Sequence, residues 1–552
     1  MKITIAQQNY HIGNFPRNKT LICNAIEEAK SQGSDLVIFS ELCIPGYPPL
    51  DLLDRIDFIE KCTQTVDEIA KECKGIAAII GSPVINRNPE GKKLFNTAYL
   101  LSEGKILFSV NKALLPTYDI FDEYRYFEPG NQFEVIPFRG LRLALTICED
   151  VWDEQPFDNE FEKQRLYSVS PVRELMKHKP DIIINISASP FSHTKTHARD
   201  NIFISKSKKY KVPLINVNQT GANTELIFNG SSLLVNANGQ IVSRLPFFDE
   251  AIKTFTTDEL FSGIAGDADT VQIPGPVELI HKALVTGIRD YFAKTNFRKC
   301  IIGLSGGIDS ALVLCLAVEA LGNENVRALL MPSRFSSETS VTDAEVLARR
   351  LDILYDIINI DKAFSTFEKE LEPLFRGTQK DVTEENIQAR IRAILLMAVS
   401  NKYGCILLNT SNKSEVSVGY GTLYGDMAGG LSVIGDVYKS EVYKLADYIN
   451  REKEIIPHNT ITKLPSAELR PGQLDTDTLP EYKILDSILY QYIELQKPAE
   501  RITGEGIDRA TVDSVIRMIN YNEFKRYQAP PVLRVSSKSF GDGRRMPLVA
   551  RY

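Results

Sequence analysis

The chain alternates short apolar segments with longer amphipathic segments, a pattern typical of layered α/β proteins. In the first half, apolar runs between turn residues predict buried strands, and between the first two runs the apolar residues recur at helical spacing. We therefore expect helices that lie outside a sheet. The predicted strands of this half are residues 35–40, 76–84, 141–147, 181–187 and 213–217, with a further strand-like segment at 106–110.

A second α/β series begins after residues 262–278, where the pattern lapses into Gly, Asp and Pro. The sequence therefore predicts two domains, at residues 1–262 and 279–552, joined by a linker at 263–278. The second series has predicted strands at 300–304, 326–331 and 405–409, predicted helices at 308–321, 344–351 and 384–403, and a further apolar segment at 353–360.

Composition narrows the class of protein. The 552 residues are 43% hydrophobic and 24% charged, which excludes a disordered or collagen-like chain. The net charge of −7 argues against a nucleic-acid binder, and no apolar run reaches the roughly 18 residues of a membrane span. The eight cysteines form no CxxC pair. We therefore expect a reduced, cytoplasmic enzyme that acts on small molecules.

Three polar residues follow predicted strands of the first half: Glu41, Lys112 and Cys148. Taken singly, each has an ordinary interpretation, as a solvated acid, a solvated base and a small buried residue. Together they form a chemically complete set. A carboxylate can take the proton of a thiol nucleophile, and an ammonium can stabilise the oxyanion that forms when a carbonyl is attacked.

The segments FSELCIPGYPPLDLL, NKALLPTYDIFDEYRYFEPG and LTICEDVW surround these three residues in that order. In this respect the first 260 residues or so resemble the nitrilase-like amidohydrolases, and among them the glutaminase domain of glutamine-dependent NAD synthetases. The resemblance implies an α-β-β-α sandwich in which Glu41, Lys112 and Cys148 are catalytic. It also implies that Tyr118, Ser189 and Lys195 bind glutamine.

In the second half, a glycine-rich loop follows a predicted strand and opens a predicted helix. Glycines allow close backbone approach, and the N–H groups at a helix N-terminus attract phosphate. A bare SGG is more often a tight turn, but the strand–loop–helix context of SGGIDS favours a nucleotide site. The loop consists of Gly303, Leu304, Ser305, Gly306, Gly307, Ile308, Asp309 and Ser310.

This loop resembles that of the ATP pyrophosphatases, which split ATP into AMP and pyrophosphate. The resemblance implies a Rossmann-like domain with a parallel sheet. The charge of the leaving group calls for a metal ion. Asp309 and Glu415, which lies in LNTSNKSE, are the candidate ligands of Mg²⁺.

Several later segments resemble the NAD synthetase family in particular, among them ENIQARIRAILLM, GYGTLYGDMAGG and PSAELRPGQLDTDTLPEY. The resemblance implies ATP binding by the loop and Thr410, and binding of deamido-NAD by Asn386, Glu415 and Lys525. Asp426 and Lys439 are secondary candidates. Thr476 departs from the acid expected there, which leaves the roles of Asp475 and Asp477 open.

The resulting hypothesis is an ATP-dependent ligase that amidates deamido-NAD to NAD through an adenylated intermediate, with ammonia from glutamine, and that releases AMP, pyrophosphate and glutamate. The alternatives are an amidotransferase for another acid, and a nucleotide sensor without turnover. The family resemblance also implies a homo-oligomer, at least a dimer. The basic C-terminal tail, from Lys525 onward, is either a solvated segment or a cover over an anionic ligand or a neighbouring subunit.

Overall fold

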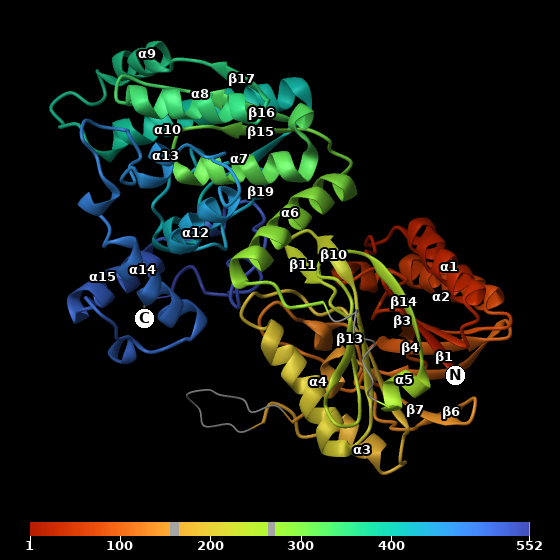
Figure 1. The fold of residues 1–552 in the computed structure, drawn as a ribbon. Helices are drawn as coiled ribbons and strands as arrows, with labels where there is room; N and C mark the ends of the chain where they lie inside the picture. Colours follow the sequence, from red (N-terminus) through yellow and green to blue (C-terminus); the bar gives the residue numbers. More distant parts are fainter. Residues whose placement is uncertain (155–164, 263–270, 551–552) are drawn as a thin grey trace. The chain divides into compact units, whose positions relative to one another are not determined.

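Two six-stranded sheets form the centre of residues 1–273 in the computed structural model, which describes residues 1–154, 165–262 and 271–550 (Figure 1). The first sheet has the order β14-β1-β2-β3-β4-β5, and the second has the order β13-β12-β9-β8-β7-β6. The strands of the first sheet are β1 (Lys2–Gln7), β2 (Leu36–Ile38), β3 (Ala77–Ile85), β4 (Leu94–Ser102), β5 (Lys105–Asn111) and β14 (Ala251–Thr256). Those of the second sheet are β6 (Ile136–Phe138), β7 (Leu141–Ile147), β8 (Ile182–Ser187), β9 (Leu214–Asn218), β12 (Leu233–Val235) and β13 (Ile241–Arg244), and a separate hairpin pairs β10 (Thr220–Asn223) with β11 (Leu226–Asn229).

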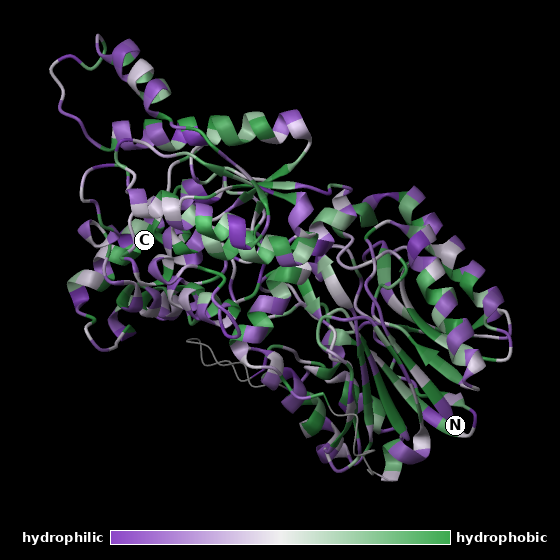
Figure 2. Ribbon diagram, turned by 45° about the horizontal axis from the view of Figure 1, so that its top comes forward, coloured by the Kyte–Doolittle hydropathy of each residue, from purple (hydrophilic) through white to green (hydrophobic). Residues whose placement is uncertain are grey.

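Alternating side chains of these strands divide between two buried layers. Ile38 and Ile79 of the first sheet pack against Leu145 and Ile184 of the second. The opposite face of the first sheet packs against α1 (Phe15–Ser31) and α2 (Ile56–Glu72), and that of the second against α3 (Pro171–Met176) and α4 (Thr196–Tyr210). Because the central strands, such as β2 and β8, are buried on both faces, they form continuous apolar runs in the sequence, and Figure 2 shows many strands of this unit as hydrophobic. The predicted α-β-β-α sandwich is confirmed.

The second compact unit, residues 274–552, is built on a five-stranded parallel sheet with the order β17-β16-β15-β18-β19. In a sheet of this order, the strand succession reverses between β15 and β18, and ligands bind at the carboxyl ends of the strands there. The strands are β15 (Cys300–Gly303), β16 (Val326–Leu330), β17 (Leu354–Ile357), β18 (Ile406–Asn409) and β19 (Leu431–Ser432). The predicted Rossmann-like domain is confirmed.

Helices cover this parallel sheet. Ile391 and Leu396 of α10 (Val382–Tyr403) pack against the apolar side chains of β15, β16 and β18. On another side, α7 (Ile308–Leu321) packs against α6 (Pro276–Thr295) and α12 (Lys439–Ile449). The predicted helix at 308–321 matches α7 (Ile308–Leu321), whereas α8 begins six residues before the predicted start at 344, because Ser337 caps it. The other helices of more than five residues are α5 (Thr257–Ser262) in the first unit and, in the second, α6 (Pro276–Thr295), α8 (Glu338–Arg350), α9 (Asp361–Leu371), α10 (Val382–Tyr403), α11 (Lys413–Val418), α12 (Lys439–Ile449), α14 (Tyr482–Leu489) and α15 (Arg509–Tyr521).

The basic C-terminal tail is not simply a solvated segment. Arg526 is buried and donates hydrogen bonds to the carbonyls of Val416 and Ser417, while Arg544 pairs with Glu523. These arginines therefore bind carbonyl and carboxylate groups of their own unit. Arg551 lies outside the described residues. Within the described ranges, no helix has the length and apolar character that a membrane crossing needs.

Candidate functional site

Three side chains from separate strand ends meet in the first unit. Glu41 follows β2, Lys112 follows β5 and Cys148 follows β7. The Nζ of Lys112 donates a hydrogen bond of 2.8 Å to Oε1 of Glu41, and both side chains are fully buried. Although burial opposes the charge of Lys112, the carboxylates of Glu123 and Glu41 hold its pKa well above the usual value. The structure therefore keeps a charged ammonium beside the carboxylate of Glu41.

Cys148 lies at a sharp turn between β7 and a short 3-10 helix. Its backbone has a φ of +42°, an unfavourable conformation for a residue with a side chain. Asp150 holds the turn, since its carboxylate accepts the backbone N–H groups of Ile147, Ala113 and Leu114. Burial, and next the charge of Glu41, raise the pKa of the Cys148 thiol well above its ordinary value. The resting thiol is therefore protonated, and its activation requires a base.

A second carboxylate, Glu123, was missed by the sequence analysis. Lys112 donates to it at 2.8 Å, and the hydroxyl of Tyr47 donates to it at 3.0 Å. Asn96 adds a hydrogen bond of 2.8 Å to Glu41. Glu123 lies in the quoted segment around Lys112, but the ten residues between the two form irregular chain, so no periodicity could show that they meet.

The three predicted glutamine-binding residues have different surroundings. The hydroxyl of Tyr118 donates to Glu149, the neighbour of Cys148, at 2.9 Å, and Tyr167 donates to the same oxygen. Ser189 follows β8, where its backbone N–H donates to Asn218. Lys195 is exposed and precedes the first residue of α4. Of the three, Tyr118 is thus the residue whose contacts lie nearest in the sequence to Cys148.

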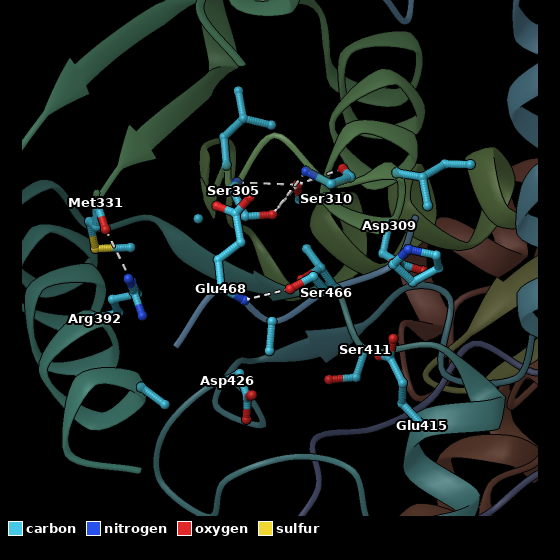
Figure 3. A pocket seen from close by; sticks show the side chains of 18 of the residues that line it. Ser305, Asp309, Ser310, Met331, Arg392, Ser411, Glu415, Asp426, Ser466 and Glu468 are labelled. Carbon is cyan, nitrogen blue, oxygen red and sulfur yellow. Dashed lines mark hydrogen bonds between the residues drawn. The ribbon is translucent and has the colours of Figure 1, made fainter. Parts of the chain in front are cut away.

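A cavity of about 290 Å³ lies at the carboxyl ends of the strands in the second unit (Figure 3). Every residue of the predicted loop lines it except Gly306, and Thr410 lines it as well. The hydroxyl of Ser310 accepts the backbone N–H of Ser305, which draws the loop back toward the start of α7. This is the arrangement in which backbone N–H groups can face the phosphates of a nucleotide.

Gly306 is the position where the loop requires glycine. Its φ is +83°, and an added Cβ would lie 2.1 Å from the carbonyl oxygen of Ser340. We expect Gly306→Ala to displace the loop and to weaken binding of a nucleotide to it, measured by titration of ATP, with a local conformational cost of about 1–3 kcal/mol. Gly377→Ala is the matched control, since Gly377 also has a positive φ, of +86°, but lies outside the cavity, and an added Cβ would meet nothing within 4 Å. Equal ATP affinities for the two variants would contradict this interpretation of the loop.

The two predicted metal ligands lie on the same side of the cavity (Figure 3). Lys439 forms ion pairs with both Asp309 and Glu415, the latter at 3.6 Å, and Asn412 donates to Asp309 at 2.9 Å. Burial, and next the charge of Asp309, raise the pKa of Glu415. One lysine thus faces two carboxyl groups. In the described part of the chain, no group of three or more His, Cys, Asp or Glu side chains could hold a metal ion.

The remaining predicted dinucleotide contacts lie around the loop between α11 and β19. Asn386 accepts a hydrogen bond from Thr422, and Lys525 donates to the carbonyls of Gly419 and Gly421. Asp426 accepts the backbone N–H of Thr422 and lines the cavity. These side chains therefore surround one loop, while only Glu415 of the three predicted contacts lines the cavity itself.

The structure also shows the contacts of Asp475 and Asp477, whose roles the sequence left open. Asp475 lines the cavity and accepts the hydroxyls of Tyr420 and Tyr482, whereas Asp477 caps a short 3-10 helix and pairs with Arg470. The sequence analysis missed three further features: Arg392 and Lys463, which line the cavity, and the buried Lys413, which pairs with Asp436 and Glu494 and so fixes the start of α11.

Two protein families each match one unit of the chain, and related proteins match the chain over its whole length. The carbon-nitrogen hydrolase family matches residues 2–260, and the NAD synthase family matches residues 280–529. The glutamine-dependent NAD(+) synthetase of Synechocystis sp. is 42% identical over 100% of this chain and 99% of its own, and that of Thermotoga maritima is 39% identical over 100% and 99%. Among solved structures, the glutamine-dependent NAD+ synthetase of Acinetobacter baumannii in complex with ADP has a TM-score of 0.78 at 36% identity, covering 99% of this chain and 98% of that one.

Proposed function

Because this chain belongs to the glutamine-dependent NAD(+) synthetase family, we propose that its two buried sites carry the two halves of that ligase reaction. Glu41, Lys112 and Cys148 release ammonia from glutamine, and the cavity at residues 303–310 uses ATP to activate deamido-NAD. The observation that carries the first assignment is the buried Lys112–Glu41 contact of 2.8 Å. For the second, it is the pairing of Asp309 and Glu415 through Lys439 beside the glycine-rich loop.

In the first reaction, Glu41 takes the thiol proton as Sγ of Cys148 attacks the amide carbon of glutamine. The ammonium of Lys112 stabilises the resulting oxyanion, and Glu41 passes the proton to the departing ammonia. Water, deprotonated by the same carboxylate, then cleaves the thioester to glutamate. Tyr118, Ser189 and Lys195 are proposed to bind glutamine. Glu123 acts on Lys112, which it keeps charged and in place.

We expect Lys112→Met to lower glutaminase turnover by about 10² to 10³, the usual effect of losing one oxyanion stabiliser. Synthesis of NAD with ammonium should change little, because it does not use this site. The measurement is glutamate released per minute, beside NAD formed with ammonium chloride alone.

The burial of Lys112 demands a stability control. Its removal leaves Glu41 and Glu123 without their cation, and unpaired buried charges destabilise proteins. The thermal midpoint of the variant should therefore be measured, and ammonium-dependent synthesis reports whether the second unit is intact. Near-normal glutamine hydrolysis by a folded variant would remove Lys112 from the mechanism.

In the second reaction, the nicotinate carboxylate of deamido-NAD attacks the α-phosphorus of ATP, and pyrophosphate leaves. Ammonia then attacks the adenylated carbonyl, loses a proton and displaces AMP. The N–H groups of the loop at residues 303–310 and the side chain of Thr410 are proposed to hold ATP. Asn386, Glu415 and Lys525 are proposed to orient the dinucleotide.

Mg²⁺ is proposed as the metal ion of this site. Two carboxylates that share one lysine offer the hard oxygen ligands that Mg²⁺ prefers, so the residues fit the ion. Asp309 and Glu415 would hold it. When bound, the ion supplies positive charge to the phosphates and the leaving pyrophosphate.

One experiment tests the proposed substrate. Purified protein is incubated with ATP, Mg²⁺, glutamine and a panel of carboxylic acids, and the products are read by mass spectrometry. We expect NAD from deamido-NAD only. Amidation of another acid would support the alternative amidotransferase, and absence of pyrophosphate formation with every acid would support a nucleotide sensor.

We also propose a linker at residues 263–278, of which residues 263–270 lie outside the described residues, a homo-oligomer of at least two subunits, and a cytoplasmic location. Size-exclusion chromatography with light scattering tests the homo-oligomer. A monomeric, fully active enzyme would overturn it.

A further inference from the structure

One cation in the ATP cavity has unused hydrogen-bond donors. Arg392, Lys439 and Lys463 are the cationic side chains among the described residues that line the cavity. Lys439 is committed to Asp309 and Glu415, and Lys463 to Glu468 and Ser340. Arg392 uses only its Nε, which donates to the carbonyl of Met331 at 3.1 Å.

The two Nη groups of Arg392 meet no acceptor among the described residues, and they are not sealed from solvent. Burial lowers the pKa of this guanidinium to about 10, because the acids nearest to it, Asp426 first and then Glu468, do not form an ion pair with it. It nevertheless stays charged at neutral pH. The two Nη groups of a half-buried, charged guanidinium form a fork of N–H donors. Such a fork at a ligand cavity can bind two oxygens of a planar or tetrahedral oxyanion.

The local fold fixes the direction of this fork. Ala389, Arg392, Ala393 and Leu396 form the stripe of α10 that faces the cavity, and Arg392 is its polar member. Leu396, one turn further along, lies 3.1 Å from the place where a Cβ of Gly303 would be. The Met331 carbonyl, at the end of β16, then holds the guanidinium from one side (Figure 3).

We propose that Arg392 is a substrate-binding residue whose Nη fork binds an oxygen pair of the ATP phosphate chain. ATP is favoured over deamido-NAD because Arg392 and the glycine-rich loop line the same cavity, whereas two of the three proposed contacts to deamido-NAD, Asn386 and Lys525, do not line it. The inference rests on the proposed use of this cavity for ATP. Figure 3 shows Arg392 across the cavity from Asp309 and Glu415, so the phosphate chain would be held from two sides.

The test compares Arg392→Met and Arg392→Lys with a control on the same helix, Lys402→Met, whose side chain is exposed and outside the cavity. ATP, adenosine and deamido-NAD are titrated into the full-length protein with Mg²⁺ by calorimetry. We expect Arg392→Met to weaken ATP binding by about 10- to 100-fold, the range of one charge-assisted pair. Arg392→Lys should be intermediate, and adenosine and deamido-NAD affinities should not change.

Three results would overturn the proposal: unchanged ATP affinity in Arg392→Met, equal losses for ATP and adenosine, or a loss confined to deamido-NAD. The second would mean that Arg392 only shapes the cavity through Met331, and the third that its fork serves the other substrate. The unliganded thermal midpoints identify a folding defect, in which case Arg392→Lys carries the comparison. NAD synthesis by the wild type in the same preparation separates failure of this proposal from failure of the proposed function.

Discussion

Replacing Cys148 by alanine should abolish NAD synthesis from glutamine and leave synthesis from ammonium close to the wild-type rate. In the proposed mechanism the thiol forms the thioester, and no other group at the turn can replace it, because Glu149 and Asp150 are committed to Tyr118 and to backbone N–H groups. The cavity proposed to bind ATP belongs to another compact unit, and the synthesis proposed there can use free ammonia as its nitrogen source. The measurement is NAD formed per minute with glutamine alone, and then with ammonium chloride alone at mildly alkaline pH.

The alanine variant should fold, since it removes one sulfur atom from a site held by backbone hydrogen bonds. The thermal midpoint checks this. Cys43, a buried cysteine two residues after Glu41 that contacts the backbone of Gly81, provides a matched control: Cys43→Ala should retain glutamine-dependent synthesis. Wild-type use of glutamine by the Cys148 variant would show that another residue is the nucleophile. A folded variant that fails with both nitrogen sources would disprove the independence of the two sites.

Replacing Asp309 by asparagine should abolish NAD synthesis from either nitrogen source. The amide can still accept the hydrogen bond from Asn412 but removes one of two carboxylates proposed to bind Mg²⁺. Metal stabilisation of phosphoryl charge contributes several kcal/mol, so a loss of about 10³-fold or more is expected. Glutamine hydrolysis should continue, because Cys148 and Glu41 are untouched. The assay follows pyrophosphate, NAD and glutamate in parallel.

Asp356→Asn is the matched control for this variant. Asp356 lies on β17 of the same sheet and pairs with Arg327 away from the cavity, so its loss should leave synthesis nearly unchanged. A normal rate of ammonium-dependent synthesis by Asp309→Asn would refute the metal assignment. Simultaneous loss of glutaminase activity would instead indicate a defect beyond the second unit.

The sequence by itself determined the layers of both units and the strand ends that carry chemistry. Buried parallel strands are apolar on both faces, so β7 and β8 are visible as continuous runs, and the polar residues just beyond such runs are conspicuous. The strand–loop–helix arrangement of residues 303–310 likewise follows from local spacing. Motif order and flanking residues were enough to predict the family, which the comparisons confirm.

Short and edge strands were not visible in this way. Strand β14 pairs antiparallel with β1, about 250 residues earlier in the chain, and five of its six residues remain partly exposed, so it has no apolar signature. The basic tail is a similar case. Its charge was evident, but only the fold shows that Arg526 is directed into the carbonyls at the end of α11.

The tertiary structure alone decided which polar groups share a site and which are already satisfied. Glu123 and Lys112 meet because an irregular segment folds back. The two Nη groups of Arg392 have no acceptor among the described residues, because the Met331 carbonyl accepts a hydrogen bond from its Nε alone. Neither result follows from periodicity, which reports the face of an element but not the partner across a cavity. Sequence patterns record burial locally, whereas hydrogen-bond partners and electrostatic surroundings depend on contacts between distant segments.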